Sequence, residues 1–97
     1  AWPDDVSTFA REQGVAEYLG GVLAMTRRIF PTARRVDVRV DEDPEIADDR
    51  HIVLSVEAEG PDVAAAVAAE ARWCRELFRC CPPTVVCVFR LDLETTD

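Results

Sequence analysis

The sequence predicts an α+β protein, a two-layer α/β sandwich with the element order α-β-β-α-β. Residues 35–41 alternate valine and charged side chains, and residues 51–58 place Ile52, Leu54 and Val56 on one face, which is typical of strands with one buried face. Two longer segments space their apolar residues as amphipathic helices do. We therefore expect one domain over residues 1–97, with a three-stranded antiparallel sheet in the order 2-1-3 and two helices on one face.

The first helix is expected to begin between Asp4 and Ser7, which are common capping or first-turn residues, and to end before Pro31. Gly20 and Gly21 interrupt this helix at an energetic cost. We interpret them as a site of close packing against a neighbouring element rather than as a hinge. The apolar stripe of the helix comprises Val15, Ala16, Leu19, Val22, Leu23, Ile29 and Phe30.

The first strand is predicted over residues 34–41, with three valines on one face and four charged residues on the other. A connection over residues 41–50 follows, in which six of ten residues are acidic. Residues 51–58 alternate again, with Ile52, Leu54 and Val56 on one face. Two alternating strands joined by a polar segment predict an antiparallel hairpin with a long loop.

The second helix is predicted to open at residues 60–62, where Pro61 occupies the first helical position, and to stop at Pro82 and Pro83. Its predicted buried stripe comprises Val63, Val67, Ala71, Cys74, Leu77, Phe78 and Cys81. The last strand is predicted over residues 84–93, with a fraying tail after it. Its inward positions are Val85, Cys87, Phe89, Leu91 and Leu93, and its outward ones are Val86, Val88, Arg90 and Asp92.

Composition excludes several functions. All eleven basic residues are arginines, so a Schiff-base lysine and a phosphate-binding-loop lysine are both ruled out. The net charge of −8 disfavours nucleic-acid binding and anionic membranes. No apolar run approaches the roughly 18 residues that suggest a membrane span. The four cysteines accompany no visible secretion signal, so we expect reduced thiols and a cytoplasmic location.

Candidate chemical sites are weak. Asp41, Asp43 and Glu45 have the first spacings of a calcium loop, but Ile46 and Ile52 stand where glycine and glutamate are needed. The cysteines lack the spacing of zinc ligands, and Cys80 is the one we expect to be exposed. Ser55 lies about 13 Å along the strand from His51, which is too far for a catalytic pair. We expect no catalytic residue, no metal and no cofactor.

The charged face of the sheet is the predicted contact surface. Valines should lie among its ion pairs, and the face carries no outward aromatic residue that could stack on RNA bases. We expect this face, or an exposed strand edge, to meet a protein partner or a second copy of the chain. The predicted interaction residues are Arg35, Asp37, Arg39, Val53, Val86, Val88 and Arg90.

The middle third of the chain resembles a loose group of small uncharacterised bacterial proteins. In that group a helix ending in Phe-Pro precedes an alternating strand, an Asp-Pro-Glu connection and a second strand. Here Phe30-Pro31, the strand at 34–41, Asp43-Pro44-Glu45 and the strand at 51–58 carry the resemblance. No activity is attached to the pattern, so it implies no functional residue; it favours a bacterial protein.

The sequence favours a non-enzymatic interaction or regulatory module, either bound to a protein partner or forming a homodimer. The alternative is a small-molecule-binding or enzymatic domain. Its pocket would lie between the helices and the sheet and would use His51, Cys80 and carboxylates of the acidic connection.

Overall fold

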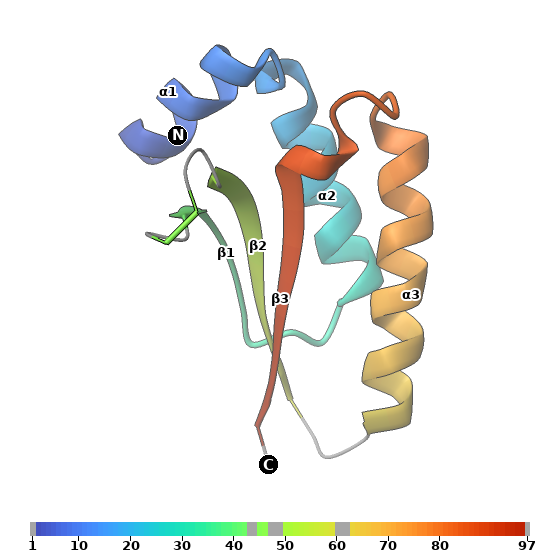
Figure 1. Ribbon diagram of the computed structural model, residues 1–97. Helices are drawn as coiled ribbons and strands as arrows, with labels where there is room; N and C mark the ends of the chain where they lie inside the picture. The colour runs from blue at the N-terminus through green and yellow to red at the C-terminus, as the bar shows by residue number, and fades with distance from the viewer. Residues whose placement is uncertain (1, 43–44, 47–49, 60–62, 97) are drawn as a thin grey trace.

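The computed structural model describes residues 2–42, 45–46, 50–59 and 63–96. Three helices and a three-stranded sheet form two layers (Figure 1). The α-helices are α1 (Asp4–Gln13), α2 (Leu19–Ile29) and α3 (Val63–Cys80); the strands are β1 (Arg35–Glu42), β2 (Arg50–Glu59) and β3 (Phe89–Thr96); short 3-10 helices are η1 (Ala16–Tyr18) and η2 (Val86–Val88). The residues predicted to open the second helix (60–62) and Asp43-Pro44 lie outside the described residues.

The sheet has the order β1-β2-β3, so the predicted order 2-1-3 is wrong. It is also mixed rather than antiparallel, because β2 pairs antiparallel with β1 and parallel with β3. The hairpin is confirmed, with Val38 opposite Leu54. Helix α3 therefore connects two adjacent parallel strands, which is the usual strand–helix–strand unit.

The composition of β2 explains why it is central. Ile52, Val53 and Leu54 are consecutive and all buried, so this strand needs cover on both faces. The alternating charges of β1 instead suit an edge, where a neighbouring strand lies on one side only and the outward side chains stay exposed. The prediction placed the last strand beside the first, whereas the apolar run of β2 favours the central position for β2.

The predicted first helix is two helices. Gly14 adopts the left-handed conformation, with φ of 70°, and its N–H donates to the carbonyl oxygens of Ala10 and Arg11. This conformation ends α1, and the 3-10 turn η1 leads into α2. Gly20 and Gly21 are exposed, with no atom within 4 Å of an added Cβ, so the expected close packing at these glycines is wrong.

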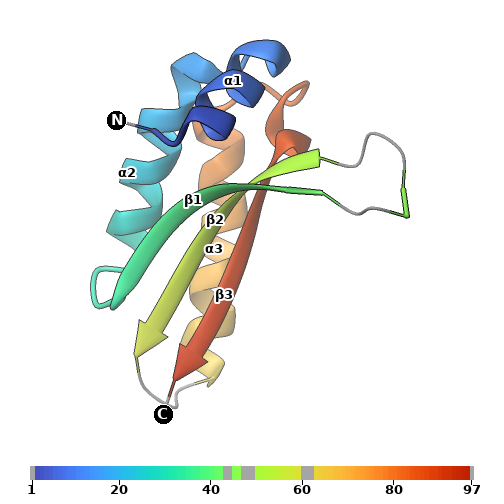
Figure 2. The same cartoon turned by 90° about the vertical axis from the view of Figure 1, so that its left-hand side faces the viewer.

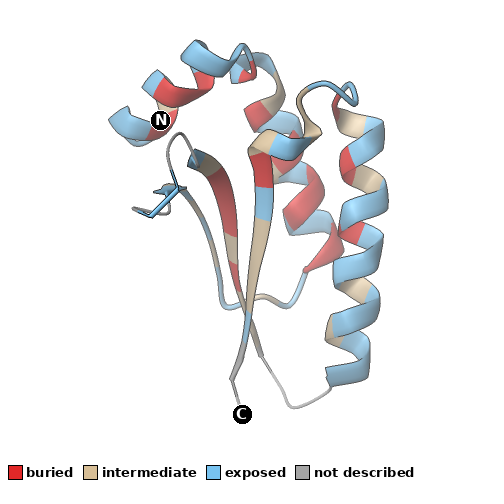
Figure 3. Cartoon of the chain, in the orientation of Figure 1, coloured by how far each residue is buried: buried red, intermediate tan, exposed pale blue. Residues whose placement is uncertain are grey.

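The core lies between the helices and one face of the sheet, as the buried segments of α1, α2 and β2 show (Figure 3). One polar side chain of the described residues lies within it. The hydroxyl of Thr26 on α2 donates to the carbonyl oxygen of Val22 at 2.7 Å and accepts a hydrogen bond from Trp73 Nε1 on α3 at 2.8 Å. Both polar groups are thus satisfied, and they link α2 to α3.

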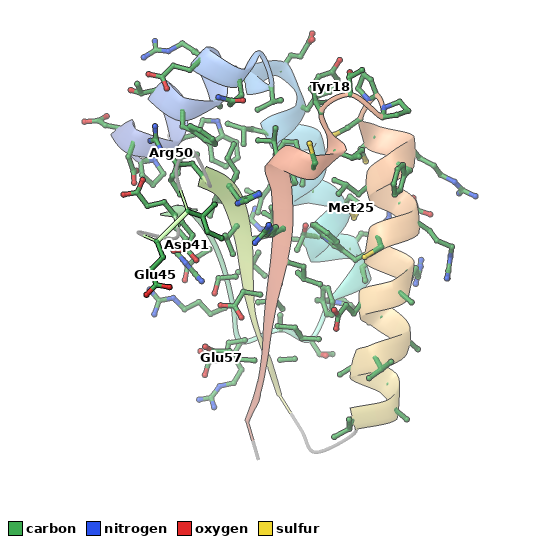
Figure 4. The ribbon with its side chains drawn as sticks, in the orientation of Figure 1. Tyr18, Met25, Asp41, Glu45, Arg50 and Glu57 are labelled. Carbon is green, nitrogen blue, oxygen red and sulfur yellow. The ribbon has the colours of Figure 1, made fainter. Side chains whose placement is uncertain are left out.

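Helix α1 packs over one end of the sheet through its buried Val6, Phe9 and Ala10, and Arg50, the first residue of β2, adds polar contacts to it. The guanidinium carbon of Arg50 lies 4.5 Å from the ring centre of Phe9, a cation–π contact. Its nitrogens lie 3.8 Å from Glu12 of α1 and 3.7 Å from Glu42 of β1. Figure 4 shows Arg50 beneath α1, with Asp41 at the same end of the sheet and Glu57 at the other.

The last strand begins later than the sequence predicts. After α3, the N–H of Val85 donates to the carbonyl oxygen of Pro82 and that of Val88 to Val85, forming the turns of η2. Strand β3 starts at Phe89 and pairs with β2 as far as Thr96, so it includes residues 94–96 of the tail that was predicted to fray. The inward positions Phe89, Leu91 and Leu93 are confirmed as part of, or packed against, the core.

Candidate functional site

Helix α3 has apolar side chains on two faces. The inner face carries the buried Trp73 and Leu77, with Ala69 half-buried. The other face is exposed: Val63, Val67 and Phe78 have 64%, 59% and 61% of their surfaces accessible. We call the five residues with this exposure and helical spacing the outer stripe of α3: Val63, Val67, Ala71, Cys74 and Phe78.

The predicted buried stripe of this helix is therefore wrong except at Leu77 and Cys81. The helix is rotated so that Trp73, which the prediction overlooked, lies in the core. A buried tryptophan removes more apolar surface from water than a valine or alanine, and its N–H needs a buried acceptor, which Thr26 supplies. The pair Trp73 and Leu77, four residues apart, was the sequence signal for the true inner face.

A groove of about 480 Å³ separates the outer part of α3 from the beginning of β3. Apolar side chains from α3, η2 and β3 form most of its surface, and Glu70 and Arg90 are its charged members. The remaining lining residues are Trp73, Cys74, Leu77, Phe78, Val86, Cys87, Phe89 and Leu91. The groove continues the outer stripe of α3 towards the sheet.

The groove runs beside a strand with an open edge. Within the described part of the chain, β3 pairs with β2 on one side and with no strand on the other. Along its outer side an edge strand presents backbone N–H and C=O groups that another chain can bond. The groove and the edge together offer apolar contact and main-chain hydrogen bonds in one place.

The charged face of the sheet brings together five of the predicted interaction residues: Arg35, Asp37, Arg39, Val53 and Arg90. Arg39, Val53 and Arg90 form one row across the three strands. Arg39 spans β2 to reach Asp92, with Nη2 and Oδ2 2.8 Å apart, and Arg35 is paired with Asp37. Val53 is only 5% exposed, so its apolar surface is already covered.

Val86 and Val88 do not lie on this face. Both belong to η2, ahead of β3, and both are half-buried against the core. The sequence assigned them to the outward face because it extended the last strand back to residue 84. Val86 instead lines the groove beside α3.

The thiols are placed differently from the prediction. Cys74 and Cys87, expected in the core, are exposed and line the groove, while Cys80 is half-buried. Cys81 is buried, and this burial, with a smaller contribution from Cys80, raises the pKa of its thiol to about 11. Cys81 is therefore protonated at neutral pH, and the two groove cysteines are the accessible thiols.

The alternative pocket around His51 and Cys80 is not the groove, whose lining residues include neither. His51 is a half-buried residue of β2 and lies opposite Asp41 of β1. The site that the sequence missed is the outer stripe with its groove. The sequence feature that indicated this site is the number of apolar residues in α3, which is larger than one buried face of a helix can hold.

The described residues contain no group of three or more histidine, cysteine, aspartate or glutamate side chains that could hold a metal ion. Among the described helices, none combines the length and apolar character required to cross a membrane. No protein-family model matches this chain, and no curated protein or solved structure matches it either. The geometry of the groove and of the strand edges is therefore what bears on function.

Proposed function

We propose that this protein is a non-enzymatic interaction module. It binds a partner polypeptide as an added strand along the open edge of β3, with the partner's apolar side chains in the groove. Strand addition of this kind combines main-chain hydrogen bonds for affinity with side-chain pockets for specificity. The proposal requires no cofactor, and it includes the cytoplasmic location that the four thiols suggest.

The observation that carries the proposal is the position of the exposed apolar residues. Four large apolar side chains among the described residues are exposed: three belong to the outer stripe of α3, and the fourth is Ile46. Contiguous exposed apolar surface marks interaction sites in folded proteins. Here it adjoins the groove that flanks the β3 edge.

A small-molecule ligand is the second candidate. The groove volume of about 480 Å³ falls within the range of small-molecule sites, roughly 300–1,000 Å³. Its lining is mainly apolar with two charged groups, as such sites usually are. This function would replace the partner's side chains by an apolar ligand in the same place.

The test is native mass spectrometry of the protein purified from the cells that make it, comparing Phe78→Glu with Ile46→Glu. Both substitutions place a charge on an exposed apolar position, but only Phe78 lines the groove. We expect a stoichiometric second polypeptide that Phe78→Glu loses and Ile46→Glu keeps. Hydrogen exchange should then show slower exchange of the β3 amides in the complex than in the free protein.

A retained small molecule that Phe78→Glu loses would replace the proposed function by the second candidate. A protein that carries neither polypeptide nor ligand, or a partner that both variants keep, would contradict both candidates for this groove.

A further inference from the structure

Strand β1 forms the second open edge of the sheet. Its inner neighbour is β2, and no other strand of the described chain pairs with it. Figure 2 looks onto this strand, which crosses in front of β2 and β3. Every second residue of such an edge strand turns its N–H and C=O groups away from the sheet, where a further strand can bond them.

The charges of this strand are complementary to the same strand read backwards. Residues 34–42 read Arg-Arg-Val-Asp-Val-Arg-Val-Asp-Glu. When two copies lie antiparallel with Val38 opposite Val38, every arginine faces an acidic residue. The facing pairs, each occurring twice by symmetry, are Arg34 with Glu42, Arg35 with Asp41, and Asp37 with Arg39.

The neighbouring registers are unfavourable. A shift of two residues in one direction places Asp37 opposite Asp41 and Arg39 opposite itself. The same shift in the other direction places Arg35 opposite Arg39 and Asp37 opposite itself. Like charges directly opposite are destabilising, and a shift of one residue would turn the valines to the charged face. Among the registers within two residues of it, the alternation therefore selects this one, in which the two strands also overlap along their full length.

The apolar side of β1 favours the same pairing. Val36, Val38 and Val40 pack against the core but remain half-buried. In the selected register Val36 faces Val40 of the second copy and Val38 lies on the two-fold axis. The pairing would thus cover apolar surface that a single copy leaves partly in water.

Charges on an edge strand usually prevent pairing with other strands. On β1 the charges disfavour strands that would place like charges opposite them, but not a second copy of β1 itself. Arg35 already contacts Asp37, and Arg39 contacts Asp92, but both arginine side chains are at least 44% exposed. Each guanidinium has five N–H donors and can bond an additional carboxylate. A strand with the complementary order of charges is favoured, and a strand that places like charges opposite these residues is disfavoured.

We propose that two copies of this protein pair antiparallel along β1 with Val38 on the two-fold axis, forming a continuous six-stranded sheet. The pairing is isologous, since the same strand contributes both halves of the contact. It goes beyond the proposed function, uses the opposite edge of the sheet and leaves β3 and the groove free.

The test uses two charge variants of β1. The acidic variant (Arg35→Asp with Arg39→Asp) has four aspartates on the outer face, and the basic variant (Asp37→Arg with Asp41→Arg) has four arginines. Analytical ultracentrifugation should show a dimer for the natural sequence. Because like charges then meet at all four positions of the outer face (35, 37, 39 and 41), each variant alone should have a dissociation constant raised by at least about tenfold.

An equimolar mixture of the two variants should form a heterodimer, which native mass spectrometry resolves by mass. The control matched to the acidic variant is Arg72→Asp with Arg75→Asp. It changes two arginines to aspartates at exposed positions of α3 instead of β1, and it should remain dimeric. Circular dichroism and thermal unfolding establish that each variant is folded. If a variant does not fold, slower exchange of the β1 amides at high protein concentration tests the natural sequence directly.

A natural sequence that stays monomeric at high concentration would overturn the proposal, as would a dimer that both β1 variants keep. Loss of the dimer in the α3 control would place the contact elsewhere. Phe78→Glu should leave the dimer intact while abolishing partner binding, so failure of one proposal is distinguishable from failure of the other.

Discussion

Thr26 illustrates how one polar group in the core can connect two helices. Its hydroxyl accepts the hydrogen bond of Trp73 Nε1 and is itself fully buried. Thr26→Val keeps the shape but leaves the indole N–H without this acceptor, so we expect a loss of about 1–3 kcal/mol in the free energy of unfolding. Urea denaturation measures it, with Thr26→Ser as the control that keeps the hydroxyl.

A double-mutant cycle with Trp73→Phe separates the hydrogen bond from the loss of packing. The double variant should lose less stability than the two single losses added together, because Phe has no N–H to leave unsatisfied. Additive losses would show that the hydrogen bond contributes nothing.

The raised pKa of Cys81 makes the free energy of unfolding depend on pH at high pH. Its pKa rises from 9.0 to about 11 on folding, mainly through burial. The folded state therefore keeps the thiol proton that the unfolded state releases. This contribution is fully present below pH 9 and is lost as the pH rises from 9 to 11. We expect the urea midpoint to fall across that window.

Cys81→Ala should flatten this fall, and Cys74→Ala, which removes an exposed thiol, should keep it. The chain has no lysine that would titrate in the same window. Burial and Glu17 also raise the pKa of Tyr18 above 10.0, which adds a decline of the same sign at higher pH. A Cys81→Ala protein with an unchanged pH profile would assign the decline to another group.

At the scale of elements, Gly14 separates α1 from α2. Gly14→Ala meets no steric clash, but an alanine in the left-handed region costs about 1–2 kcal/mol. Gly20→Ala and Gly21→Ala lie in α2 with open space around them, and each should stabilise the protein by about 0.4–1 kcal/mol. Urea unfolding of the three variants gives the signs; a stabilising Gly14→Ala would argue for one continuous helix.

Helix α3 shows that amphipathic spacing locates a helix more surely than it identifies its buried face. This helix carries two sets of apolar residues on adjacent faces. Trp73 and Leu77 belong to one set, and Cys74 and Phe78, each one residue later, belong to the other. The set with Trp73 faces the core because the larger side chain gains more from burial and finds an acceptor for its N–H. The other set becomes the outer stripe.

At the scale of the whole molecule, the sheet has two open edges of different character. The β3 edge adjoins an apolar groove, and the β1 edge carries alternating charges. The charged face between them pairs within itself, as Arg39 and Asp92 show. A protein with both proposed contacts would present two partner-binding grooves at the two ends of one six-stranded sheet.

The sequence by itself determined the alternation of helical and strand segments, the β1–β2 hairpin and the inward positions of Ile52, Leu54 and Phe89. These are local properties, because periodicity and turn residues act over a few neighbouring positions. It did not locate the break at Gly14, since the left-handed conformation of one glycine leaves no periodic signal.

Only the tertiary structure decided the strand order, the rotation of α3 and the late start of β3. Each of these three features depends on which apolar side chains, from segments far apart in the sequence, are buried together in the core. Strand β2 is central because Val53 needs cover on the second face, and Trp73 displaces the valines of α3 from the core. The candidate sites follow from these long-range contacts. The groove depends on the rotation of α3, and β1 lies at an edge of the sheet because β2 takes the central position.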